Sequence, residues 1–167
     1  MDWKTILSFI IGATLLTLLS GWLMAANLLQ IQTQIAYSEA ELGFVKIWIQ
    51  IAIVIGLLLP VIAFLVWIHN PNMRTIFGGY LLVMVIQIVT EQICSRIFSP
   101  SLLLIIGTIY TTFRIWQLTV AKQKFLTVNP QNGNVNFYIA YCLLWLMLVF
   151  WSANLIFLLV VGWLRIL

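Results

Sequence analysis

Polar side chains at helical spacing, set within apolar stretches, are the residues of this sequence best suited to chemistry. Gln87 and Glu91 lie four residues apart, and Tyr110 and Arg114 repeat that spacing. Residues four apart lie on one face of a helix. An ionisable group at membrane depth is a functional hypothesis by default, because it is costly when unpaired. These four residues are the candidate site for a ligand headgroup or a proton.

The same four residues also have a structural interpretation. The break at Pro100 is short, so the helices on either side of it should be antiparallel neighbours whose polar stripes face each other. Helical side chains lean toward the N-terminus of their helix, which brings Glu91 and Arg114 toward one another. We expect a bridged pair, with Gln87 and Tyr110 filling the remaining hydrogen-bond sites. Such a pair could serve only to fix helix packing, and the sequence leaves both interpretations open.

The composition indicates that lipid is the solvent for most of the chain. Of its 167 residues, 63% are hydrophobic and 7% are charged, whereas soluble domains carry about 25% charged residues. The net charge of +4 comes from scattered Lys and Arg side chains that form no basic stripe. We therefore expect the lipid bilayer as a partner and no nucleic acid.

A membrane-spanning helix needs about 20 apolar residues, and the chain has five such runs. We predict an all-α integral membrane protein, a bundle of five transmembrane helices in a single domain over residues 1–167. The helices are expected at about 5–29, 39–68, 75–98, 102–120 and 137–164. The alternative has four spans, with 102–120 re-entrant or lying in the interface. Ser38 and Glu41 have the spacing of a capping box at the start of the second helix.

Small residues recur at every fourth position of the first helix, a pattern that lets another helix approach closely. The second helix offers Gly56 and Pro60 as a matching surface, and Pro60 should also kink that helix. Contact within the bundle and a subunit interface are both open. The predicted helix-packing residues are Ala13, Thr17, Gly21, Ala25, Gly56 and Pro60.

The distribution of cations predicts the orientation of the chain. Five spans place four cations on the side of the N-terminus and three on the other, and cytoplasmic loops carry the excess of Lys and Arg. We therefore predict a multi-pass protein with a cytoplasmic N-terminus. The two groups are Lys4, Arg74, Lys122 and Lys124, against Lys46, Arg96 and Arg165.

The chain's size, five expected spans and eight tryptophans resemble the tryptophan-rich sensory (translocator) proteins, which bind porphyrin-like ligands. That family's Pro/Trp-rich first loop is replaced here by 30–41, so membership is not inferred. No cofactor is predicted from the residues, and a porphyrin-like pigment or a bound lipid stays open.

No motif in the sequence specifies a reaction. The chain lacks a phosphate loop, an H-E-x-x-H motif and a G-x-S-x-G motif, and we predict no catalytic residue and no metal site. We expect a non-enzymatic accessory or assembly subunit of a larger membrane complex, in contact with other membrane-protein subunits or as a homo-oligomer. The alternative is a small oligomeric transporter, channel or lipophilic-ligand-binding protein. Whether the polar stripe faces a cavity or is sealed between helices distinguishes the two.

Overall fold

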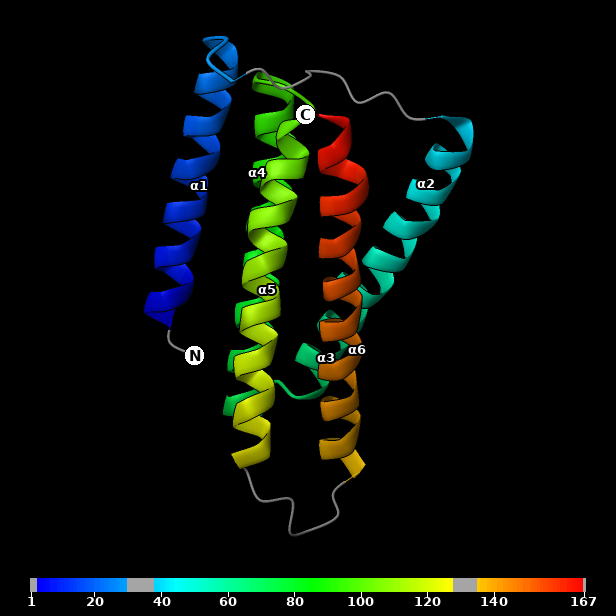
Figure 1. Ribbon diagram of the computed structural model, residues 1–167. Helices are drawn as coiled ribbons and strands as arrows, with labels where there is room; N and C mark the ends of the chain where they lie inside the picture. Colours follow the sequence, from blue (N-terminus) through cyan, green and yellow to red (C-terminus); the bar gives the residue numbers. More distant parts are fainter. Residues whose placement is uncertain (1–2, 30–37, 128–134, 167) are drawn as a thin grey trace.

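Five long apolar helices form the protein, and each is a candidate membrane span. The computed structural model describes residues 3–29, 38–127 and 135–166, and Figure 1 shows the helices standing side by side. The predicted all-α membrane bundle is confirmed. The four-span alternative is wrong, because residues 102–120 belong to one continuous helix of 26 residues. The elements are α1 (Trp3–Ala25), α2 (Glu39–Ile53), α3 (Leu59–Val66), α4 (Pro71–Ile97), α5 (Leu102–Thr127) and α6 (Val135–Phe157).

The starts of α2 and α4 follow from their capping residues. The Ser38 hydroxyl accepts the backbone N–H of Glu41, and the Glu41 carboxylate accepts the backbone N–H of Ser38 at 2.8 Å. This is the predicted capping box. The α4 helix begins at Pro71, four residues earlier than expected. There the Asn70 side chain caps the helix, and proline suits the first helical position.

The first helix ends at Ala25, whereas the sequence predicted about residue 29. Asn27 has a φ of 55°, a left-handed conformation that glycine and asparagine adopt most readily. The N–H groups of Asn27 and Leu28 then bond the carbonyls of Met24 and Leu23 at 3.0 and 2.9 Å. These two bonds form a Schellman motif, which stops the helix.

The second span is interrupted near Pro60, where a kink was expected. A π-helical segment, η1 (Val54–Leu58), joins α2 to α3. Proline cannot donate the backbone bond of a regular helix, so the turn before it is free to widen. In Figure 1, α2 leans away from the other helices toward its N-terminal end. None of its 15 residues is buried.

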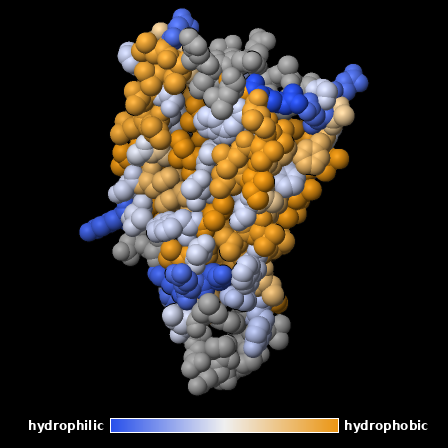
Figure 2. Space-filling view, viewed as in Figure 1, coloured by the Kyte–Doolittle hydropathy of each residue, from blue (hydrophilic) through white to orange (hydrophobic). Residues whose placement is uncertain are grey.

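The α4 and α5 helices form the centre of the bundle. Buried side chains of α1 pack against one side of this pair, and those of α3 and α6 pack against the other. The last span continues beyond α6 as a second π-helical segment, η2 (Leu158–Gly162), and a short 3-10 turn, η3 (Trp163–Arg165). Figure 2 shows apolar side chains over the middle of one face and hydrophilic groups toward its ends, as a bilayer requires.

The predicted helix-packing residues divide between two places. Ala13, Thr17 and Gly21 are buried on the side of α1 that faces α4 and α5. A Cβ at Gly21 would lie 2.6 Å from the Phe98 ring, so this glycine permits the contact. Ala25, the last residue of α1, is exposed, so it does not pack within the bundle, and its role at a subunit interface stays a prediction. Gly56 does not match α1 as expected, because its neighbour is Trp151 of α6.

Candidate functional site

A fully buried arginine lies at the centre of the bundle. Arg114, in the middle of α5, has 0% exposure, and its Nη2 donates a hydrogen bond to Gln87 Oε1 on α4. Gln87 Nε2 in turn donates to Glu91 Oε1. Gln87 therefore connects the guanidinium to the carboxylate.

The predicted direct bridge between Glu91 and Arg114 is wrong, because Gln87 lies between them. The reason is the register of the helix pair. At 1.5 Å per residue from the break, Arg114 is about 22 Å along its helix, against about 18 Å for Gln87 and about 12 Å for Glu91. Gln87 is thus the nearer partner. Among the described residues, the ion pair of the structure is Arg165–Glu41, at one end of the bundle.

Two aromatic side chains complete the surroundings of the guanidinium. Arg114 Cζ lies 4.1 Å from the centroid of a Trp151 ring on α6 and 5.8 Å from that of Tyr80 on α4. A cation stacked on an aromatic face away from water gains about 2 kcal/mol or more. The rings therefore help Arg114 to tolerate burial at membrane depth. We call Gln87, Glu91, Arg114, Tyr80 and Trp151 the central network.

The central network also reaches the proline-interrupted second span. Trp151 Nε1 donates to the Tyr80 hydroxyl at 2.9 Å, and that hydroxyl donates to the Gly56 carbonyl at 2.7 Å. Pro60, four residues after Gly56, has no N–H to offer this carbonyl. Tyr80 supplies the missing donor.

The arrangement requires glycine at position 56, because Trp151 leaves no room for a side chain there. A Cβ at this position would lie 2.6 Å from Trp151 Cζ2, which is closer than atoms in contact allow. The absence of a side chain lets the indole ring lie against the backbone of η1. Gly56 and Pro60, predicted as packing residues, thus lie beside the central network.

Tyr110 is buried on the predicted face of α5 but does not join the central network. Its ring packs edge-on against Phe9 of α1, with centroids 5.3 Å apart, and its hydroxyl has no hydrogen-bond partner in the described part of the chain. The hydrogen bond that was predicted from Tyr110 to the Glu91–Arg114 site is therefore not observed among the described residues. Arg114 Nε and Nη1 and the Gln117 amide share this lack of a partner.

The predicted site residues include three members of the central network, Gln87, Glu91 and Arg114. They miss Tyr80 and Trp151. Tyr80 lies on the same α4 stripe as Gln87, seven residues earlier, so its spacing was an available signal. Trp151 lies in the middle of its apolar run, too deep for an interfacial belt, and that depth was its signal. Pro60, four residues after Gly56, was the signal that the Gly56 carbonyl lacks its helical donor, but no pattern indicated that Tyr80 would bond it.

The central network is buried between helices except at Glu91. Arg114 and Gln87 are 0% and 8% exposed, and only Glu91 is partly accessible. The network joins α4, α5, α6 and η1, so its geometry suits fixing four segments relative to one another. Within residues 3–29, 38–127 and 135–166, no three His, Cys, Asp or Glu side chains gather as a metal site would require.

Comparison with known families gives one assignment. Residues 6–166 match a family described as "Domain of unknown function (DUF7733)". The chain belongs to this family. The match spans all five long helices and every residue of the central network. No curated protein and no solved structure matches the chain. The description specifies no role.

Proposed function

We propose that this polytopic membrane protein is non-enzymatic and acts through helix contacts, as an accessory or assembly subunit of a larger membrane complex. The observation that carries the proposal is α2, which buries none of its residues within this chain. By contrast, α1 buries five. Membrane helices associate by close packing, so a helix that packs little within its own chain is the one best placed to meet another subunit.

The buried central network supports this proposal over a transporter or channel. A conduction path needs polar groups along its wall, and Arg114 instead contacts Gln87 and Trp151. An enzyme needs an acid, a base or a metal within reach of a substrate. The same burial argues against that role for Arg114.

The outward face of α2 is the proposed contact surface for a transmembrane helix of another subunit. This face continues into η1, and its exposed side chains are Ile47 and Ile51 of α2 and Val54 and Leu58 of η1. The exposed face of α1 is the matched comparison, because it is equally apolar. It carries Ile11, Leu15, Leu19 and Trp22.

We also propose that the N-terminus is cytoplasmic. The support is the excess of Lys and Arg expected on that side of the membrane. Reporter fusions to the two termini test the orientation, and activity of a periplasm-type reporter at the N-terminus would reverse it.

The test of the accessory role is purification of the tagged protein from its own membrane in a mild detergent, followed by native mass spectrometry. We expect other membrane subunits in fixed stoichiometry. A homo-oligomer without other proteins, retaining a small ligand, would contradict the proposal.

A pair of triple variants locates the contact. Replacing Ile47, Val54 and Leu58 by Ala should release the other subunits, because it removes the side chains that pack between helices. Replacing Ile11, Leu15 and Leu19 by Ala should leave the complex intact. Equal loss from both variants would contradict the assignment to α2.

A further inference from the structure

Two neighbouring side chains of α5 are buried with polar atoms that nothing bonds. The Arg114 guanidinium uses Nη2 for its bond to Gln87, while its Nε and Nη1 have no hydrogen-bond partner among the described residues. Gln117 lies three residues further along the helix, and both ends of its amide, Nε2 and Oε1, share that lack. The side chains of Arg114 and Gln117 are 0% and 3% exposed. Polar groups buried in this way are costly unless a partner bonds them.

Arg114 and Gln117 are close enough to share one small partner. Residues three apart on a helix have Cβ atoms about 5–6 Å from each other. A helical side chain leans toward the N-terminus of its helix, which directs Gln117 toward the turn that carries Arg114. The Tyr110 hydroxyl is not counted with them, because its ring lies against Phe9 of α1.

The unpartnered atoms specify the chemistry of that partner. It has to accept an N–H of the guanidinium, and it has to donate to Gln117 Oε1, which can only accept. Chloride or another simple anion accepts but cannot donate, so it would leave Oε1 without a bond. A metal cation would meet a guanidinium of like charge. Water both donates and accepts, and buried waters make about three hydrogen bonds each to polar groups of this kind.

The charge of the central network also favours a neutral partner. Gln87 links the Arg114 guanidinium to the Glu91 carboxylate, so the network already holds one charge of each sign. A bound anion would leave a net negative charge at membrane depth, where an unbalanced charge is costly. Water leaves the balance unchanged.

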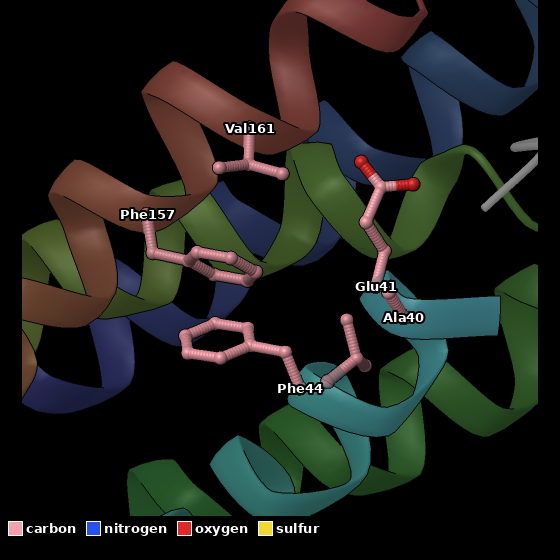
Figure 3. Close-up of a pocket in the computed structure, with 6 residues that line it drawn as sticks. Ala40, Glu41, Phe44, Phe157 and Val161 are labelled. Carbon is pink, nitrogen blue, oxygen red and sulfur yellow. The ribbon is translucent and has the colours of Figure 1, made fainter. Parts of the chain in front are cut away.

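The groove between α2 and the end of the last span makes a contrast. Figure 3 shows Phe44 facing Phe157 and Val161 there, with Glu41 at one end. The lining is apolar except for Glu41, whose carboxylate is paired with Arg165. None of the described residues that line the groove has a buried side-chain atom without a partner. The groove therefore specifies no ligand, whereas the site on α5 does.

We infer that Arg114 and Gln117 hold internal water, which accepts an N–H of the guanidinium and donates to Gln117 Oε1. The buried cation is then solvated from two directions, by Gln87 and by water, while the Trp151 ring covers its face. This inference concerns the centre of the bundle and is independent of the proposed role of α2.

The test is solid-state NMR of the full chain in lipid bilayers, with magnetisation transferred from water to nitrogen. Replacing Arg74, Arg96 and Arg165 by Lys leaves Arg114 as the single arginine of the sequence, which identifies its Nε signal without changing the site. The reference is the backbone N–H of Ile106, a fully buried residue of the same helix in an apolar cluster. We expect Arg114 Nε to receive magnetisation from water several times faster than this amide. Equal rates would mean a dry guanidinium and would overturn the inference.

Matched variants locate the water between the two side chains. Gln117→Leu removes the amide at similar size and should slow the transfer to Arg114 several-fold, because the water loses the acceptor that it donates to. Gln50→Leu makes the same change at an exposed position of α2 and should leave the transfer unchanged. Equal transfer in both variants would contradict the bridge. If Gln117→Leu does not fold, the comparison with Ile106 decides alone.

Two other arrangements have their own signatures. A direct hydrogen bond from Arg114 to Gln117 would give a short distance between a guanidinium nitrogen and the side-chain carbonyl carbon of Gln117, without fast transfer from water. A bound chloride would make the midpoint of thermal unfolding fall when chloride is exchanged for gluconate, and Gln117→Leu would abolish that fall. Either result would overturn the inference.

Discussion

The two sides of α6 differ in how they are packed. On one side, Trp151 packs against Gly56 of η1, stacks on Arg114 of α5 and donates a hydrogen bond to Tyr80 of α4. On the other, α2 leans away and is linked to the last span by the Trp48–Asn154 hydrogen bond of 2.8 Å and the Arg165–Glu41 pair. Polar contacts therefore hold the central helices together. The α2 helix has no buried residue and stays available for binding.

The largest expected effect comes from Trp151, whose ring stacks on the buried Arg114 guanidinium. Trp151→Ala removes the surface on which Arg114 rests and the donor to Tyr80. A buried Trp→Ala change costs about 3–5 kcal/mol, so the midpoint of thermal unfolding in detergent should fall sharply. Trp145→Ala, on the exposed side of the same helix, is the control and should cost much less. Equal losses would contradict a special role for the centre.

A methyl group at Gly56 should have the next largest effect. Gly56→Ala forces the new Cβ against Trp151, and overpacking of this kind costs about 1–3 kcal/mol. The matched change is Gly12→Ala, where nothing lies within 4 Å of the added Cβ. Alanine favours the helix over glycine by about 1 kcal/mol, so unfolding of the Gly12 variant should be unchanged or slightly later. The same response from both variants would show that the contact with Trp151 is unimportant.

Two tyrosines differ in whether their hydroxyl is used. Tyr80→Phe leaves the Gly56 carbonyl and the Trp151 N–H without a partner, and an unsatisfied buried group costs about 1–3 kcal/mol. Tyr110→Phe removes a hydroxyl that has no hydrogen-bond partner among the described residues, so stability should stay the same or rise. Chemical unfolding monitored by tryptophan fluorescence measures both. A greater loss in the Tyr110 variant would reverse their assigned roles.

The smallest expected effect on stability comes from Glu41, in the first turn of α2. Glu41→Gln breaks an ion pair at the surface, where such pairs contribute little, so thermal unfolding should barely change. The distance between spin labels at Leu42 and Leu164, both exposed, should spread to larger values, because α2 loses one of its two polar links to the last span. A loss of stability as large as that of Tyr80→Phe would remove the distinction between the two sides.

The five helices could be predicted from the sequence, because an apolar run of spanning length has few other solutions in lipid. The stripe with Gln87 and Arg114 was readable for a similar reason, since helical spacing places residues on one face. The partners of Arg114 were harder to predict. Trp151 comes from a segment distant along the chain, and the Gly56 carbonyl is backbone.

The lean of α2 could not be predicted at all. Lipid tails are as apolar as leucine, so the same composition suits a helix that packs on protein and one that faces lipid. The end of α1 was missed for a local reason, because Asn27 takes the left-handed position that is usually given to glycine.

Glu91 and Arg114 are opposite charges that Gln87 links at the centre of the bundle. The most direct test is a double-mutant cycle of Glu91→Gln and Arg114→Leu, with the free energy of unfolding measured in detergent. Each single change leaves the other charge without its counterpart. We predict that the double variant is more stable than the worse single variant. A double variant that is as unstable as the worse single one, or worse, would contradict the account.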